Sequence, residues 1–176
     1  KEKFGEDAWK EILIKSDVNL EFFISSEAYD DSITYQLAFA AAEVTGLPLS
    51  NVLSSLGEWW ILRTAREKYG QLLESGGDDL KEFLVNLPSF HNRITLLYTK
   101  LAPPEFQISD VGESSIKVHY FSKREGFKDF VHGLLIGLGK LYKTKVEIEL
   151  LKSREKGDSN EVFRVTWENG EPKNNI

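Results

Sequence analysis

The chain has 176 residues, of which 41% are hydrophobic and 28% are charged. These values are ordinary for a globular protein, and the length suffices for one well-cored domain. The net charge is −6, with no basic cluster and no apolar run as long as a membrane span, so neither nucleic acid nor a membrane is an expected partner. Cysteine is absent, which excludes disulfides, thiolate metal ligands and iron–sulfur clusters.

The first part of the chain, about residues 1–101, shows helical spacing of its apolar residues. Asp7–Lys15 is predicted to be a short helix, and Asp31–Thr45 a longer one that stops at Gly46. A third helix carries four large residues on one face: Leu49, Leu53, Leu56 and Trp60. The fourth predicted helix is Ala65–Glu74. The chain also lacks methionine, even at its start, so we expect it to be a fragment.

A fifth and longer helix is predicted to begin near Asp79. Glu82 follows three residues later, and this spacing is typical of a capping box at a helix start. The helix is predicted to run to about Lys100, because Pro103 and Pro104 prevent its continuation.

His91 lies at the centre of the apolar stripe of this fifth helix, one turn after Pro88, where we expect a kink. A buried histidine of this kind is often a core residue bonded to a backbone carbonyl. No second His, Asp or Glu stands three or four residues away, which argues against a zinc or di-iron site. A single imidazole is nevertheless sufficient to hold a haem, whose porphyrin supplies four more nitrogens.

From about residue 102 to 168 the apolar period changes from 3.6 to 2, which indicates strands with one solvated face. Three strands are predicted from the alternation, and a shorter one is possible at Glu105–Ser109. The three are centred on Ile116–Phe121, Val146–Leu150 and Phe163–Trp167. Phe127–Tyr142 is predicted to be an apolar helix between strands. The predicted fold class is therefore α+β, one domain with a helical part followed by an antiparallel sheet of about four strands and one packed helix.

Tyr120, Ser122 and Arg124 occupy alternate positions of the Tyr-Phe-Ser-Lys-Arg segment. On one strand they would share a face and stand about 7 Å apart. Two hydroxyls and a guanidinium in a row suit a ligand with two carboxylates, since Arg can bind a carboxylate through two parallel hydrogen bonds. The alternative is three polar residues at the end of an edge strand, each bonded locally.

Together these features resemble a known family. The segment Asn-Leu-Pro-Ser-Phe-His ending at His91, the Pro-Pro-Glu-Phe turn and the Tyr-Phe-Ser-Lys-Arg strand are similar to the H-NOX domain. That domain is a haem-based nitric oxide and oxygen sensor, related to the haem domain of soluble guanylate cyclase. Further similar segments run in order along nearly the whole chain: Gly5–Trp9, Tyr29–Ser32, Leu56–Trp60 and Tyr69–Gly70.

The resemblance implies a role for each matching residue. His91 would be the proximal ligand of the iron in a non-covalent b-type haem. The haem propionates would be held by Tyr120, Ser122 and Arg124. Pro104 would press on the porphyrin and distort it, while Trp60 and Phe130 would lie in the distal pocket where the gas binds. Two departures stand out: Pro88 replaces the usual Asp of the family, and the first helix of the family is missing here.

The distal residues predict the gas selectivity. Oxygen-binding members place a tyrosine where this chain has Phe130, which has no hydrogen-bond donor, and Trp60 is expected mainly to fill space. We therefore expect the ferrous haem to bind nitric oxide and carbon monoxide but not oxygen stably.

The resemblance also implies a signalling role in the cytoplasm rather than an enzymatic one. The partner would be a histidine kinase, a cyclic-nucleotide or cyclic-di-GMP enzyme, or a chemotaxis receptor. The sequence contains no nucleophile–base pair and no phosphate-binding glycine loop. The alternative is a haem-free protein whose pocket binds another hydrophobic carboxylate, or an interaction domain without a ligand.

Overall fold

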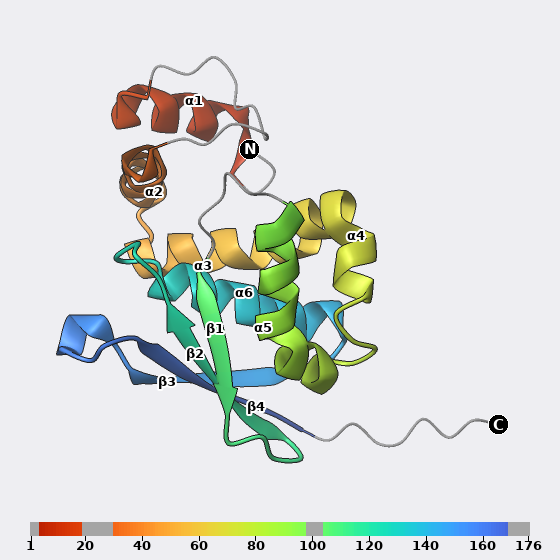
Figure 1. Cartoon of the computed structure of the whole chain (residues 1–176). Coiled ribbons are helices and arrows are strands. Elements are labelled where there is room, and N and C mark those ends of the chain that lie inside the picture. The colour runs from red at the N-terminus through yellow and green to blue at the C-terminus, as the bar shows by residue number, and fades with distance from the viewer. Residues whose placement is uncertain (1–3, 19–29, 98–103, 169–176) are drawn as a thin grey trace.

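The computed structural model describes residues 4–18, 30–97 and 104–168, and a helical part precedes a four-stranded antiparallel sheet that has one more helix between its second and third strands (Figure 1). The helical part contains α1 Gly5–Ser16, α2 Asp31–Thr45, α3 Leu49–Trp59, a π-helix Trp60–Ala65, α4 Arg66–Glu74 and α5 Leu80–Leu97. The second part contains β1 Glu105–Ser109, β2 Ser115–Phe121, α6 Lys128–Leu141, β3 Val146–Lys152, a 3₁₀ turn Arg154–Lys156 and β4 Glu161–Trp167. The predicted α+β class is confirmed.

The helix starts follow from local capping. The Asp30 carboxylate accepts a hydrogen bond of 2.8 Å from the backbone N–H of Ser32 at the start of α2. Before α5, Asp79 accepts from the N–H of Glu82, and the Glu82 carboxylate accepts from the N–H of Asp78, each at 2.8 Å. These bonds satisfy amide groups that have no partner inside the helix. The predicted fifth helix thus exists, but its expected end near Lys100 lies outside the described residues.

The predicted third and fourth helices are not separated by a loop. Instead, α3 continues through the π-helix Trp60–Ala65 into α4, which contains a break in helical geometry at Tyr69 (φ −129°, ψ 22°). A π-helix has wider turns than an α-helix and is often found at functional sites. Sequence periodicity alone does not distinguish such a wide turn from a boundary between two helices.

The sheet has the strand order β1-β2-β4-β3. The alternating pattern predicted for β2 is confirmed, because Ile116, Val118 and Tyr120 are buried on one face while the residues between them are partly exposed. In the ladder between β2 and β4, Val118 pairs with the buried Phe163 and Tyr120 with the buried Glu161. One face of the sheet therefore belongs to the core.

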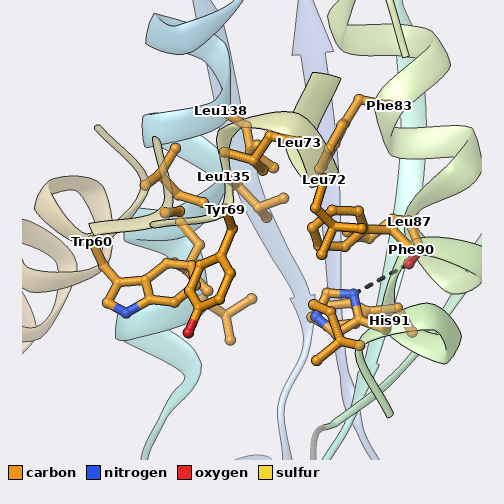
Figure 2. Close-up of a pocket in the computed structure, with 16 residues that line it drawn as sticks. Trp60, Tyr69, Leu72, Leu73, Phe83, Leu87, Phe90, His91, Leu135 and Leu138 are labelled. Carbon is orange, nitrogen blue, oxygen red and sulfur yellow. Dashed lines mark hydrogen bonds between the residues drawn. The ribbon is translucent and has the colours of Figure 1, made fainter. Parts of the chain in front are cut away.

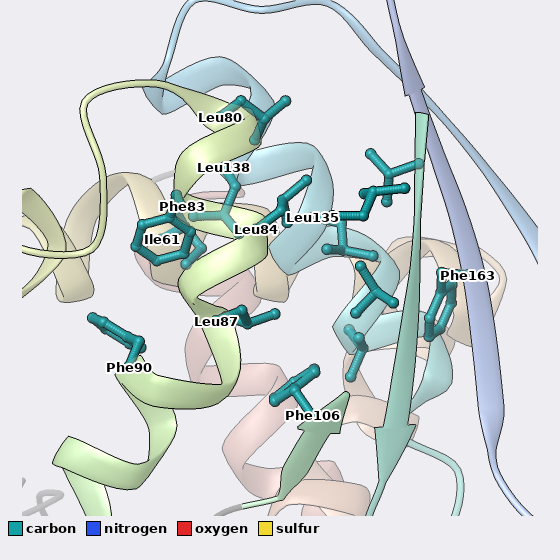
Figure 3. Close-up of a cluster of buried hydrophobic side chains, with 14 of the residues drawn as sticks. Ile61, Leu80, Phe83, Leu84, Leu87, Phe90, Phe106, Leu135, Leu138 and Phe163 are labelled. Atoms are coloured by element: carbon teal, nitrogen blue, oxygen red, sulfur yellow. The ribbon is translucent and has the colours of Figure 1, made fainter. Parts of the chain in front are cut away.

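The core lies between α5, α6 and this sheet face (Figure 3). Helices α3 and α6 cross very closely: a Cβ added at Gly133 would lie 1.9 Å from the Ser54 carbonyl oxygen, and one at Gly57 2.1 Å from the Phe130 carbonyl oxygen. Only glycine permits this backbone approach. The crossing places α3 against α6, and Trp60, which follows α3, packs against the core.

Among the described residues, no single helix has the length and apolarity of a membrane span. The segments Ser32–Thr45 and Leu49–Glu74 reach that composition only as a pair, with a bend of 114° between them.

Candidate functional site

An apolar cavity of about 150 Å³ lies between the π-helix, α4, α5, α6 and β1 (Figure 2). It is lined by Trp60, Ile61, Ala65, Tyr69, Leu72, Leu73, Phe83, Leu87, Phe90, His91, Ile94, Phe106, Val131, Leu134, Leu135 and Leu138. Apart from Trp60, Tyr69 and His91, every lining side chain is hydrocarbon. In Figure 2, Trp60 and Tyr69 stand on one side of the view and His91 on the other.

His91 is held in a defined tautomer. Its Nδ1 lies 3.2 Å from the carbonyl oxygen of Leu87, one turn earlier on α5. A carbonyl can only accept, so Nδ1 carries the proton and the lone pair of the neutral ring is on Nε2. Burial lowers the pKa of His91 to about 4, although the hydrogen bond to Leu87 acts in the opposite direction. The imidazole is therefore neutral at physiological pH, the form that binds metals.

The other two histidines are engaged elsewhere. His132 on α6 lies with Nδ1 3.2 Å from the Ser54 hydroxyl of α3, and burial lowers its pKa. His119 on β2 has Nε2 2.7 Å from the Ser109 hydroxyl of β1. Of the three histidines, His91 is the one that lines the cavity.

A chain of aromatic contacts joins His91 to the polar motif on β2. The rings of His91 and Phe106 have centroids 4.4 Å apart, and those of Phe106 and Tyr120 are 5.5 Å apart. Phe106 comes from β1, which pairs with β2 in the register Phe106 to Tyr120. Helix α5 and the sheet thereby bring together two sequence-predicted residues that are 29 positions apart.

Tyr120, Ser122 and Arg124 lie together, but the expectation that they share one strand face is wrong. Strand β2 ends at Phe121, so Ser122 and Arg124 belong to the bent connection to α6. Tyr120 is 3% exposed, and burial raises the pKa of its phenol while a hydrogen bond with Ser122 lowers it. The Ser122 hydroxyl accepts from the backbone N–H of Arg124 at 3.0 Å. The turn gathers these groups at one end of the strand.

The three other residues predicted to contact the haem or its gas lie at different places relative to the cavity. Trp60 lines the cavity and stacks on Tyr69, with ring centroids 6.4 Å apart. Phe130 is partly buried on α6 and meets Phe127 edge-on at 5.8 Å, outside the set of residues that line the cavity. Pro104 is partly buried directly before β1.

A model of the Haem-NO-binding family (HNOB) matches residues 1–150. The chain therefore belongs to the haem-NO-binding family. Among curated relatives, soluble guanylate cyclase gcy-37 of Caenorhabditis elegans is 31% identical over 94% of the chain, and gcy-31 of the same organism is 29% identical over 86%. The chain spans only 24% and 22% of the lengths of these two relatives.

Solved H-NOX structures share the fold. The chain matches an H-NOX protein from S. oneidensis in the Fe(II)NO ligation state with a TM-score of 0.84 and 18% identity, covering 96% of this chain and 92% of that one. A mutant H-NOX from K. algicida, Fe(II) and unliganded, matches with a TM-score of 0.82 and 23% identity, covering 96% and 90%. The family assignment predicted from the sequence motifs is thus confirmed.

The residues present fit the haem that this family is named for. The cavity offers one neutral imidazole nitrogen among hydrocarbon walls, and Phe106 in its lining contacts Tyr120 of the polar motif, whose own residues lie outside the lining. Among the described residues, no cluster of three or more His, Cys, Asp or Glu competes as a metal site. The volume of about 150 Å³ is below the ~300 Å³ at which small-molecule pockets usually begin. The cavity is therefore smaller than a porphyrin needs, and within it the Phe106 ring lies against His91.

Several residues of the site were missed from the sequence. Phe106 was expected only as part of a short strand and of the Pro-Pro-Glu-Phe turn, and Tyr69 only as part of a segment that resembles the family. Arg154 and Glu161 form a 2.9 Å ion pair, and Glu161 is the β4 partner of Tyr120. They gave no signal in the sequence, because an Arg and a Glu seven residues apart across a turn look like any solvated pair. Phe106 could have been found from its alternation with Ile108 on the inner face of β1.

Proposed function

We propose that this domain senses nitric oxide and carbon monoxide at a ferrous b-type haem held without a covalent bond. One observation carries the proposal. The neutral imidazole of His91 lines an apolar cavity and touches Phe106, and Phe106 in turn touches Tyr120 of the polar motif. An iron ligand and a group of carboxylate-binding side chains are therefore separated by one aromatic ring, an arrangement that suits a porphyrin with propionates at one edge.

Each residue then has a defined task. His91 would hold the iron through Nε2, since its Nδ1 is fixed by the Leu87 carbonyl. Pro104, directly before β1, would contact the porphyrin. The haem propionates are bound by Tyr120, Ser122 and Arg124. When bound, ferrous haem supplies an iron coordination position that a diatomic gas can take.

Hydrogen-bond donors near the bound gas decide which gases a haem protein holds stably. Oxygen gains much more from a donor than nitric oxide or carbon monoxide does. Phe130, the residue predicted to be distal although it lies outside the cavity lining, has no donor, and Trp60 lines the cavity with a large apolar ring system. We therefore propose a sensor that does not hold oxygen stably. Tyr69 also lines the cavity and carries a hydroxyl, so it is the first residue to substitute if oxygen does bind.

The proposed output is a conformational change passed to a signalling partner. Helix α5 carries His91 and packs on β1, so a movement of this helix reaches the sheet. Curated relatives named as soluble guanylate cyclases favour a cyclic-nucleotide enzyme as the partner. A histidine kinase, a cyclic-di-GMP enzyme and a chemotaxis receptor are the other classes. We propose that the domain acts as a sensor in the cytoplasm and catalyses no reaction itself.

The volume of the cavity favours one other candidate function. A cavity of about 150 Å³ accommodates a small apolar chain more readily than a porphyrin. The second candidate is therefore a haem-free domain that binds a hydrophobic carboxylate, with its acid group at Tyr120 and Arg124.

Titration of the haem-free protein with haem distinguishes the two candidate functions. The haem proposal predicts a sharp Soret band that saturates at one haem per chain and persists through gel filtration. Competition by a large excess of a medium-chain fatty acid should leave the band unchanged. Absence of a saturable band, together with tight binding of the fatty acid, would overturn the haem proposal in favour of the second candidate.

A further inference from the structure

The connection that carries Ser122 and Arg124 is held by a distant arginine. Arg154 lies in the 3₁₀ turn between β3 and β4, and its Nη1 and Nη2 each donate a hydrogen bond of 2.7 Å, to the backbone carbonyl oxygens of Ser122 and Arg124. Residues 122–126 lie between β2 and α6 and belong to neither element. These two contacts and the Ser122 hydroxyl bond hold the backbone of residues 122–124.

A buried carboxylate fixes Arg154 in turn. Nε of Arg154 lies 2.9 Å and 3.0 Å from the two carboxylate oxygens of Glu161, whose side chain is 4% exposed. Glu161 pairs with Tyr120 across the β2–β4 ladder, so both side chains lie on the same side of the sheet. Such a buried pair needs close geometry and further hydrogen bonds to offset its desolvation, and the two carbonyl bonds supply them.

The turn that carries Arg154 is itself built to stay in place. The Asp158 carboxylate accepts from the N–H of Ser153 at 2.9 Å, and the Asn160 side-chain amide donates to the Glu161 carbonyl at 3.0 Å. Gly157 adopts φ 92°, a conformation that favours glycine. Ser153 and Asn160 are buried, although both are polar. These bonds hold the β3–β4 turn, and Arg154 with it, at the end of β2.

We propose that Arg154 is a positioning residue for the carboxylate-binding segment: it holds the backbone of residues 122–124 so that Tyr120, Ser122 and Arg124 meet the two haem carboxylates together. This inference rests on the proposed function. Arg154 acts through the backbone, and its own charge is matched by Glu161. The Arg124 guanidinium, whose carbon lies 5.8 Å from the centroid of the Phe127 ring, is the cation proposed to meet a haem carboxylate.

Arg154→Lys is the informative substitution. A lysine keeps the positive charge beside Glu161, but its single ammonium cannot reproduce the planar fork that reaches the carboxylate and both carbonyls at once. Arg164→Lys is the matched control, since Arg164 pairs with Glu149 at 2.8 Å between β3 and β4 on the exposed face of the sheet. Both changes replace one paired arginine near the same two strands.

The test measures the rate at which the haem-loaded protein loses haem to excess apomyoglobin, with protoporphyrin IX haem and with its dimethyl ester. Arg154→Lys should speed the loss of the free-acid haem about tenfold, because charge-assisted contacts to the carboxylates are misplaced. The dimethyl ester carries no charged carboxylates for the segment to bind, so the rate at which it leaves the protein should change by less than about twofold. Arg164→Lys should change neither rate.

Equal acceleration with both haems would show that Arg154 only stabilises the fold, and no acceleration would show that it is not needed; either result overturns the inference. If Arg154→Lys does not fold, the double variant Arg154→Gln with Glu161→Gln removes the buried charge pair without leaving one partner alone, and the same ester comparison applies. Failure of the wild-type protein to bind any haem would instead remove the proposed function, and the inference with it.

Discussion

The two ends of the candidate site are built in different ways. At the His91 end, the imidazole makes its hydrogen bond within α5, to a carbonyl four residues earlier, and mostly hydrocarbon side chains line the cavity around it. At the Tyr120 end, the polar groups are numerous, and the backbone that carries them is held by Arg154 from 30 or more residues away. The first end depends on one helix, and the second depends on tertiary contacts between two loops.

This difference suggests a division of tasks. The apolar end keeps an imidazole neutral and correctly oriented, which requires burial and a local hydrogen bond. The polar end must orient several donors toward two carboxylates, which requires a rigid backbone. Substitutions at the first end should therefore act on the presence of the haem, and those at the second on how tightly its edge is held.

Removal of the imidazole should have the largest effect on ligand binding. His91→Gly is expected to lower haem affinity more than ~100-fold, because loss of a ligand should exceed the 10–100-fold typical of its outer contacts. Added imidazole should restore the Soret band. His132→Gly is the control, since it makes the same change within a helix but outside the cavity lining. Retention of haem by His91→Gly would contradict the assignment of the ligand.

A methyl group added at the α3–α6 crossing should have the largest effect on the free energy of unfolding. In Gly133→Ala the new Cβ meets the Ser54 carbonyl, so the helices must separate and the free energy of unfolding should fall by about 3 kcal/mol. Gly70→Ala has no atom within 4 Å of its new Cβ and should stabilise α4 by up to about 1 kcal/mol. Urea denaturation of the two variants checks this. Equal stabilities would mean that the crossing is looser than described.

The pH dependence of stability tests the burial of His91 directly. In the haem-free protein the folded state resists protonation of His91 down to about pH 4, whereas the unfolded chain takes the proton near pH 6.5. Between these values the unfolded state binds more protons, so the free energy of unfolding should fall by up to about 3 kcal/mol as the pH drops from 6.5 to 4. His91→Gln should lose this part of the pH dependence. Urea unfolding at each pH measures this dependence. If the free energy of unfolding of His91→Gln varied with pH as the wild type's does, the His91 ring would be solvated rather than buried.

A smaller effect is expected at the polar end. Arg124→Gln should weaken haem binding about tenfold through loss of a charge-assisted contact. Lys123→Gln removes the same charge from the neighbouring exposed residue and should change the affinity by less than about twofold. Equal losses in the two variants would indicate general electrostatic attraction rather than a specific contact.

The contrast between the two ends also explains what the sequence could predict. His91 was found because the apolar stripe of a helix is a local pattern, and Tyr120 because strand alternation is local too. The continuation of the strand through Ser122 was a wrong prediction, since the chain leaves the ladder after Phe121. Arg154 could not be found, because its role exists only when the β3–β4 turn meets the end of β2.

The most direct test of the central claim is the visible absorption spectrum of the haem-loaded, reduced protein under air, carbon monoxide and nitric oxide in turn. We predict a strong Soret band that shifts with carbon monoxide and with nitric oxide and stays unchanged in air beyond slow oxidation. A band that changes promptly and persistently in air would contradict the selectivity assigned to Phe130 and direct attention to Tyr69. A protein with no Soret band, even after addition of haem, would contradict the account of the site as a haem-based gas sensor.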